Sequence, residues 1–265
     1  MNKTASVMIQ KFSLAIVLIL IGASSSESDT KETAKNQASD KARQEQPFLN
    51  SGAVDSYEIN ETAMSGEERN ASFINRVGGQ QLANNLRDGG YVIYVRHTKT
   101  DKDWGDQVSP KLDLADCNTQ RRLSPDGKIA AQGIGKGVKA ANIPIGNVVS
   151  SEYCRAYNTA ELAFGKYTKD SKLNFLPCVE CTPADYEDYA ARISPLLSEK
   201  PESGVNTFLV GHDDPFQGAT MLVEPPNGIY PAPMGVSYVI KPMGGGKFTL
   251  VAKVLPSQWK SLSQL

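Results

Sequence analysis

Short apolar runs alternate with amphipathic segments from about residue 72 to the end of the chain. Runs rich in β-branched and aromatic residues predict buried strands at residues 91–95, 147–150, 207–210, 236–240 and 248–254. A capping side chain stands before a proline at Ser124-Pro125, Thr182-Pro183 and Asp214-Pro215, which predicts that a helix starts at each. A fourth helix is expected over about residues 153–164. Alternation of strands and helices predicts an α/β fold, a three-layer α/β/α sandwich with a mostly parallel central sheet.

The first 71 residues do not share this pattern. Lys3 and Lys11, a largely apolar run over residues 12–23 and a group of serines from Ser24 are typical of a secretory signal peptide, predicted over residues 1–25. An uncleaved anchor is the alternative, but spanning a bilayer takes about 20 apolar residues. We therefore expect a periplasmic or secreted protein with no stable membrane anchor after cleavage.

The next segment, residues 26–71, is dominated by Ser, Glu, Lys, Gln and Asn. Such a stretch buries too little apolar surface to offset the entropy lost on ordering, so it predicts a disordered polar linker. The folded domain is then expected over residues 72–265.

The net charge and the motifs of the sequence give no reason to expect a nucleic acid, a metal or a cofactor. The formal net charge of the 265 residues is −1, which gives no reason to expect nucleic acid as a partner. Two histidines and scattered acids provide no zinc-ligand spacing, and nothing resembles a P-loop, so neither a metal nor a cofactor is expected. The sequence does not indicate an oligomeric state.

Polar residues follow three of the predicted strands directly. Arg96 and His97 come after the first, Arg155 lies shortly after the second, and His212 and Asp213 come after the third. Ligands of an open parallel sheet bind beyond the carboxyl ends of its strands, where these groups would meet. Two arginines and two imidazoles in one pocket suit a phosphate dianion, and a neutral imidazole can attack phosphorus.

These segments resemble the motifs of the histidine phosphatase superfamily, whose relatives include the phosphoglycerate mutases. Residues 95–98, Val-Arg-His-Thr, are similar to its Arg-His-Gly/Ala signature, with Thr98 in place of the small residue. Three further resemblances follow in family order within about residues 88–255, at residues 120–127, 150–160 and 210–212. The resemblance implies a phosphoglycerate mutase-like fold. It also implies that His97 is the nucleophile and that Arg96, Arg155 and His212 bind the transferred phosphoryl group.

The resemblance leaves the proton donor open. Asp213 directly follows the second histidine, as the aspartate does in the acid-phosphatase branch, and we take it as the catalytic acid. Glu180 and Glu187 are alternatives, because relatives near the mutases carry a glutamate after the second arginine. Asp214 is interpreted as the cap of a helix that begins at Pro215.

The function implied is an exported phosphomonoesterase that hydrolyses a small-molecule or glycan phosphomonoester through a phosphohistidine. Mutase activity is disfavoured, because glycolytic phosphoglycerate is cytosolic. The main alternative is a non-catalytic protein that binds phosphate or a phospho-ligand with a degenerate site. A third possibility is an extracytoplasmic scaffold in which the motifs are relics.

The four cysteines, Cys117, Cys154, Cys178 and Cys181, suit an oxidising compartment and permit three pairings. A Cys117–Cys154 bridge would tie the motif that contains Arg155 to the segment before the first predicted helix. A redox role for Cys178 and Cys181 is disfavoured. The cysteine pair of the thioredoxin motif normally opens a helix, whereas the helix predicted at Pro183 begins only after this pair has ended.

The adjacent Arg121 and Arg122 form a basic pair ahead of the helix at Pro125. We expect both on the solvated surface, which is the common place for arginine, with contact to a substrate anion as the alternative.

Overall fold

The computed structural model describes residues 64–102, 111–176 and 181–265 of the chain. Its strands form one sheet in the order β3-β2-β4-β1-β5-β6, in which β1 to β4 run parallel, β5 is antiparallel to β1, and β6 is antiparallel to β5. The strands are β1 Val92–Arg96, β2 Ile145–Ser150, β3 Thr168–Lys169, β4 Asn206–Gly211, β5 Ser237–Gly244 and β6 Lys247–Val254. The five predicted strands and the mostly parallel sheet are confirmed. β3 was missed because two exposed residues carry no apolar pattern.

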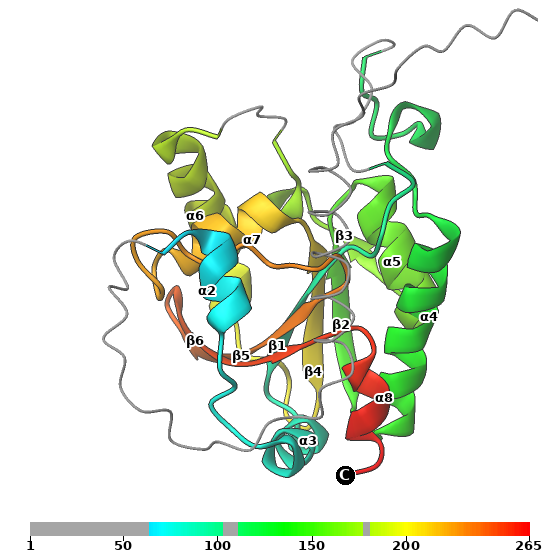
Figure 1. Ribbon diagram of the computed structural model, residues 1–265, viewed down its shortest axis with the longest axis vertical. Helices are drawn as coiled ribbons and strands as arrows, with labels where there is room; N and C mark the ends of the chain where they lie inside the picture. The colour runs from blue at the N-terminus through cyan, green and yellow to red at the C-terminus, as the bar shows by residue number, and fades with distance from the viewer. Residues whose placement is uncertain (1–63, 103–110, 177–180) are drawn as a thin grey trace, which may run out of the picture. The chain divides into compact units, whose positions relative to one another are not determined.

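Helices cover both faces of this sheet (Figure 1). They are α2 Gly66–Ser72, α3 Gly79–Asp88, α4 Pro125–Ala140, α5 Cys154–Phe164, α6 Pro183–Ser198, α7 Asp213–Thr220 and α8 Gln258–Leu262, with short 3-10 turns at Cys117–Thr119 and Ser171–Leu173. Successive side chains of β1 enter different cores, as the pleat requires. Val95 packs in a cluster with residues of α3, α4, α5 and α8, whereas Tyr94 packs with residues of α6 and α7. The three-layer α/β/α architecture is therefore confirmed.

Two of the three capped helix starts are confirmed. The Ser124 side chain accepts a hydrogen bond from the backbone N–H of Gly127, and that of Thr182 accepts one from Asp185. The interpretation of Asp214 as the cap of a helix at Pro215 is wrong. Helix α7 begins at Asp213, its N-cap residue is His212, and no side chain caps it. Both aspartates lie instead in the first turn, where the helix dipole favours negative charge.

The folded part begins earlier than the predicted boundary between residues 71 and 72. Helix α2 starts at Gly66, with Ser65 and Glu68 forming a capping box. Asn70 is buried and accepts a hydrogen bond of 2.7 Å from the Tyr238 hydroxyl of β5. The predicted signal peptide, and the predicted linker up to residue 63, lie outside the described residues.

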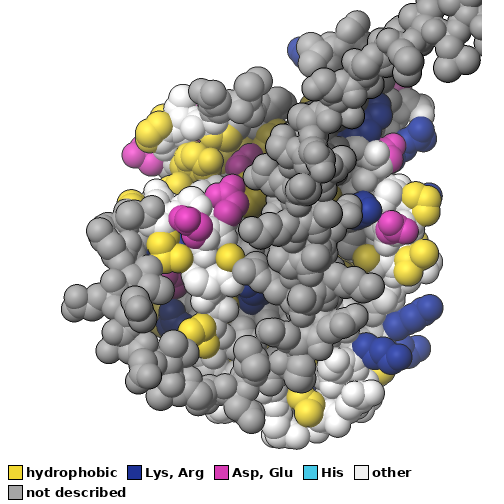
Figure 2. Space-filling model, in the orientation of Figure 1, with side chains coloured by type: hydrophobic (Ala, Val, Ile, Leu, Met, Phe, Trp, Pro, Cys, Tyr) yellow, Lys and Arg dark blue, Asp and Glu magenta, His cyan; other side chains and the backbone are white. Residues whose placement is uncertain are grey.

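Helix α4 illustrates how the outer layer meets solvent. Its inner face contributes the buried Ile134 and Val138 to the core, while its outer face carries the exposed Lys128, Lys136 and Lys139. Dark blue side chains accordingly gather on the right-hand side of Figure 2, over this helix. None of the described helices is long and apolar enough to cross a membrane.

Candidate active site

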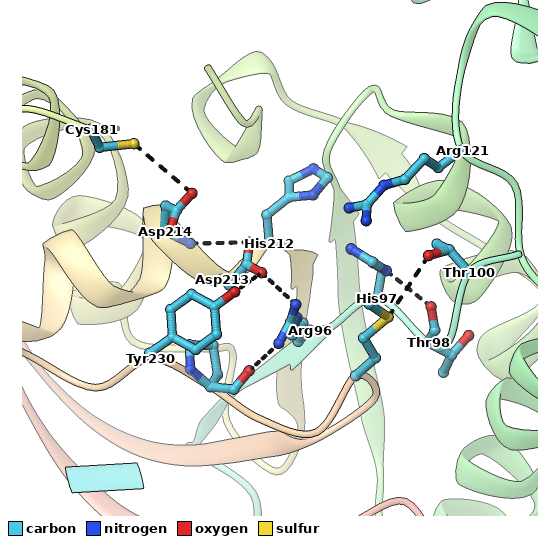
Figure 3. Close-up of polar contacts among 12 residues, drawn as sticks. Arg96, His97, Thr98, Thr100, Arg121, Cys181, His212, Asp213, Asp214 and Tyr230 are labelled. Atoms are coloured by element: carbon cyan, nitrogen blue, oxygen red, sulfur yellow. Dashed lines mark hydrogen bonds and ion pairs between the residues drawn. The ribbon is translucent and has the colours of Figure 1, made fainter. Parts of the chain in front are cut away.

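The carboxyl ends of three neighbouring parallel strands bring the candidate residues together. β4 lies between β2 and β1 in the sheet. The residues just past β1 and β2 are each fixed to β4 by a backbone hydrogen bond of 2.9 Å, from His97 to the Gly211 carbonyl and from Ser151 to the Val210 carbonyl. The imidazole centroids of His97 and His212 are 5.4 Å apart (Figure 3). The predicted convergence of the two histidines at one edge of the sheet is thus present.

His97 is fully buried, and its tautomer is fixed. Its Nδ1 lies 2.9 Å from the carbonyl oxygen of Thr98. A carbonyl can only accept, so Nδ1 carries the proton and the lone pair is on Nε2. Nε2 is buried and has no hydrogen-bond partner among the described residues. Burial, and then the charges of Arg155 and Arg96, hold the pKa of His97 well below its usual value, so the ring is neutral at neutral pH.

Thr98 connects this imidazole to helix α5. Its backbone N–H donates to Oγ1 of Thr159 at 3.1 Å, and Thr159 in turn donates to the Arg155 carbonyl at 2.8 Å. All three residues are buried. The Thr98 hydroxyl, which the small residue of the family signature lacks, also lies 3.2 Å from Oγ1 of Thr159 and so adds a side-chain contact between the segment after β1 and helix α5.

His212 is oriented by a chain of side chains that the sequence did not reveal. Its Nε2 lies 2.9 Å from the Ser151 hydroxyl, which donates its proton to Oδ1 of Asn174 at 2.9 Å. Asn174 donates to Glu152 at 2.7 Å. Because the Ser151 proton is committed to Asn174, Nε2 of His212 must be the donor in its bond to Ser151. Nδ1 of His212 is therefore the nitrogen without a proton; it is buried without a partner among the described residues, and it can donate to an anion only after it has taken up a proton.

The backbone of His212 is held by Tyr94 of β1. The Tyr94 hydroxyl accepts from the His212 N–H at 2.9 Å and donates to its carbonyl at 2.8 Å. A Cβ on Gly211 would lie 2.2 Å from this hydroxyl oxygen. Glycine is therefore required at the end of β4 for the tyrosine to reach the backbone.

The two candidate arginines come from different elements and act on the same histidine. Arg155 lies in the first turn of α5, is 1% exposed, and has its guanidinium carbon 4.6 Å from the centroid of the Tyr153 ring. Arg96, the last residue of β1, donates to the Pro231 carbonyl at 2.8 Å and forms an ion pair with Asp213. Both positive charges lower the pKa of His97.

Asp213 is largely buried between Arg96 and the Tyr230 hydroxyl, which donates to it at 2.7 Å (Figure 3). Burial alone would raise the pKa of Asp213, but the charge of Arg96, the electrostatic interaction with His97 and the Tyr230 hydrogen bond outweigh it and lower the pKa to about 2. The group is a carboxylate in the free site. Its role as the proton donor stays a prediction.

The other acids considered are placed differently. Glu187 is exposed on α6, and Glu180 lies outside the described residues. Asp214 is half-buried beside Cys181, with its Oδ2 3.9 Å from the sulfur. Burial, followed by the neighbouring charge of Asp213, raises the pKa of Asp214 to about 6.

A disulfide joins the loop before α4 to the helix that carries Arg155. Of the pairings open from the sequence, the structure contains Cys117–Cys154, and Cys181 is also disulfide-bonded. No described cysteine is free. The Tyr157 hydroxyl lies 2.9 Å from the sulfur of Cys117 and 3.1 Å from that of Cys154.

Arg121 departs from the expectation of a solvated surface residue. It is half-buried, and Figure 3 shows its guanidinium directed toward the imidazoles of His97 and His212. Arg122 is exposed as expected. The signal available in the sequence was the alternation Arg121-Arg122-Leu123, since an extended segment that buries Leu123 also turns Arg121 inward.

The charge of the site determines which ligands it can hold. Imidazoles and guanidiniums dominate it, and the carboxylate of Asp213 is already paired with Arg96. Across residues 64–102, 111–176 and 181–265, no three His, Cys, Asp or Glu side chains are grouped as a metal site would require. The arrangement suits a small anion.

Comparison with known proteins gives likeness to solved structures alone. No protein family model matches the sequence, and no curated protein matches it. A mycobacterial glucosyl-3-phosphoglycerate phosphatase is 19% identical, with 61% of this chain and 96% of that chain covered and a TM-score of 0.45. The protein histidine phosphatase SixA, complexed with tungstate, is 20% identical over 63% of this chain and 97% of its own, with a TM-score of 0.40. A phosphoserine phosphatase mutant from Entamoeba histolytica, in complex with phosphoserine, is 15% identical over 64% and 98%, with a TM-score of 0.48. These similar structures are members of the histidine phosphatase superfamily.

Proposed function

We propose that this chain is a phosphatase of the histidine phosphatase superfamily that hydrolyses a phosphomonoester through a phosphorylated His97. One observation carries the proposal. Nε2 of His97 is buried, deprotonated and without a partner among the described residues, and it faces a site lined by positive groups. A neutral imidazole nitrogen in such a setting is an activated nucleophile rather than a structural group.

The first step transfers the phosphoryl group to the enzyme. Arg96, Arg155 and His212 bind the phosphoryl oxygens, His212 after the dianion has raised its pKa and Nδ1 has taken up a proton, and these donors stabilise the charge that spreads over the oxygens in the transition state. The Nε2 lone pair of His97 forms the N–P bond while the P–O ester bond breaks. The leaving oxygen takes a proton from Asp213 and departs as an alcohol.

The second step regenerates the site. A water molecule attacks the phosphohistidine, Asp213 takes a proton from the water, and the N–P bond breaks to return neutral His97 and release phosphate. Asp213 must hold a proton when substrate is bound, although its pKa in the free site is about 2. A bound phosphoryl dianion raises the pKa of Asp213, because it competes for Arg96 and adds like charge.

The low pKa of Asp213 favours a second candidate function, namely a phosphate-binding protein without turnover. A carboxylate that stays ionised cannot protonate a leaving group. Turnover of p-nitrophenyl phosphate, measured beside tungstate binding by calorimetry, separates the two, since this activated ester needs little protonation. Turnover with competitive inhibition by tungstate supports the phosphatase. Binding without turnover supports the second candidate, and the absence of both would exclude each of them.

We also propose that the mature protein is exported and acts on a small-molecule or glycan phosphomonoester. The Cys117–Cys154 disulfide supports an oxidising compartment, where such bonds persist. Protein recovered from the periplasm or medium should begin near residue 26, by N-terminal sequencing. Its Cys117 and Cys154 should resist alkylation until the protein is reduced. An intact Met1, or ready alkylation of these two cysteines without reductant, would reject export.

The depressed pKa of His97 predicts an unusual pH profile. The neutral ring is the reactive form and predominates above the pKa. A lowered pKa of His97 therefore keeps the enzyme active at lower pH. An imidazole of ordinary pKa, about 6.5, would be about 97% protonated at pH 5 and would lose about 30-fold in kcat/KM. We expect no such loss between pH 7 and pH 5 in initial rates with p-nitrophenyl phosphate, after correction for the ionisation of the ester itself.

The lowered pKa values of His97 and His212 also make the stability of the fold depend on pH, so the activity profile needs a folding control. In the unfolded chain the histidines take up protons below about pH 6.5, whereas in the folded protein they stay neutral, so stability falls as the pH drops below that value. Circular dichroism at each pH must therefore show folded protein. A tenfold or larger fall in kcat/KM with a midpoint near pH 6.5 in folded protein would mean that His97 titrates normally.

A further inference from the structure

Arg121 is held on one side by the segment that directly follows His97. The Asp101 N–H donates to the Arg122 carbonyl at 2.9 Å, and Thr100 and Leu123 form an antiparallel bridge. In this paired, extended stretch, neighbouring side chains point in opposite directions. Leu123 is buried, so Arg121 is on the inner side and Arg122 on the outer side.

On the other side the same loop is fastened to helix α5. The disulfide joins Cys117, four residues before Arg121, to Cys154, the neighbour of Arg155. Gln120 accepts a hydrogen bond of 2.9 Å from the Cys154 N–H, and its side chain is buried. The two arginine-bearing segments therefore keep a fixed relation to each other.

The guanidinium of Arg121 extends from this loop to the two histidines (Figure 3). Its Nη1 donates to the Lys102 carbonyl at 3.4 Å, and its Nε is buried. Its charge, after burial, Arg155 and His97, lowers the pKa of His212, which places it near that ring. Nδ1 of His212 is the nitrogen with no partner among the described residues. The guanidinium thus lies beside the space into which both histidines direct their unpartnered nitrogens.

We propose that Arg121 binds the transferred phosphoryl group as a third arginine of the site, and that the Cys117–Cys154 bridge holds it there. The inference rests on the proposed function and adds a residue to it. A guanidinium offers paired donors that match phosphate oxygens. Asp213 neutralises much of the charge of Arg96, so a dianion gains from a further cation opposite that pair.

The test measures oxyanion affinity, with Arg122 as a matched neighbour. Tungstate is titrated calorimetrically, and orthovanadate is used as a competitive inhibitor, against the full mature chain and its Arg121→Gln, Arg121→Lys and Arg122→Gln variants. A hydrogen bond to a charged group is worth enough for a loss of about 10- to 100-fold in affinity in Arg121→Gln. Arg121→Lys should recover only part of it, and Arg122→Gln should bind like the parent. Arg155→Gln serves as the positive control for a lost phosphoryl contact.

Two results would overturn the assignment. One is unchanged tungstate affinity in folded Arg121→Gln with normal turnover. The other is unchanged tungstate affinity with a raised KM for larger esters, which would place Arg121 on another part of the substrate. Both differ from failure of the proposed function itself, in which the parent protein neither binds tungstate nor turns over p-nitrophenyl phosphate.

The role of the bridge is tested by a double-mutant cycle. The Cys117→Ser/Cys154→Ser variant should lose part of the tungstate affinity, and adding Arg121→Gln should then cost less than about 3-fold, because residues that act through one another are not additive. If the serine variant does not fold, reduction of the parent and of Arg121→Gln in solution replaces it. Full additivity of the two losses would show that the bridge does not hold Arg121 in the site.

Discussion

Replacing His97 with Ala should lower turnover of p-nitrophenyl phosphate by about 10⁴- to 10⁶-fold, the range seen when an enzyme loses its nucleophile or the tautomer of its catalytic base. The remaining arginines would still bind phosphate, so tungstate affinity should fall far less than the rate. An acid-labile phosphoenzyme, trapped by denaturing a reaction with radiolabelled substrate in alkaline detergent, should be absent. These three readouts together distinguish a nucleophile from a residue that only binds the anion.

His212 provides the matched control for this experiment. It is equally buried and also has one ring nitrogen without a partner among the described residues, but its other nitrogen donates to Ser151. His212→Ala should slow turnover yet still accumulate label on His97. A labelled phosphoenzyme in folded His97→Ala, with none in His212→Ala, would exchange the two roles. Circular dichroism and melting temperature show whether each variant keeps the fold, and His97→Gln replaces His97→Ala if the cavity left by alanine prevents folding.

The parts of the fold that could be predicted are those in which one local signal determines one element. Continuous apolar runs are typical of strands buried on both faces, and β1 and β4 are such strands. A capping side chain before a proline located the starts of α4 and α6. The same signal failed at Asp214, because hydrogen bonds with the Tyr94 hydroxyl fix the backbone of His212 and the helix begins two residues earlier than expected. Local capping preference is weaker than such a constraint.

The predicted sheet topology was enough to place the candidate site residues near one another. It did not predict the hydrogen bonds that these residues make. The rule that ligands meet the carboxyl ends of parallel strands was enough to bring His97 and His212 together. The partners of these histidines come from distant segments. Asn174, for example, reaches Ser151 across 23 residues of chain. A polar residue in a loop gives no local sign of such a contact, so the sequence could not predict it.

The expectation for Arg121 shows a different limit. Base rates place arginine on the surface, and the sequence reading followed them. The disulfide, one of three pairings that the sequence left open, and the paired segment after His97, for which the sequence gives no sign, together turn the side chain inward. A covalent constraint that spans 37 residues overrides the tendency of one side chain.

Asp213→Asn should reduce the turnover of alkyl phosphates by about 10²- to 10⁴-fold, the usual contribution of general acid catalysis, and that of p-nitrophenyl phosphate clearly less. An alkoxide must take a proton as the P–O bond breaks, whereas nitrophenolate leaves largely without one. Asp213 also pairs with Arg96, so the variant will loosen a phosphoryl-binding residue as well. Loosening of Arg96 should lower the turnover of both substrates by the same factor. The proton-donor role is therefore measured by the difference between the two losses, not by either alone.

Matched variants assign that difference to one carboxyl group. Tyr230→Phe removes the hydrogen bond to Asp213 but keeps its carboxyl, so it should raise the pKa of Asp213 and preserve leaving-group discrimination. Asp214→Asn, Glu180→Gln and Glu187→Gln test the other acids, of which Asp214, with its pKa raised to about 6, holds a proton most readily in the free site. Equal losses on both esters in Asp213→Asn, with a selective loss on alkyl phosphate in one of these three, would transfer the role to that residue. If none of the four discriminates while Asp213→Asn weakens tungstate binding, the carboxylate positions Arg96 and donates no proton.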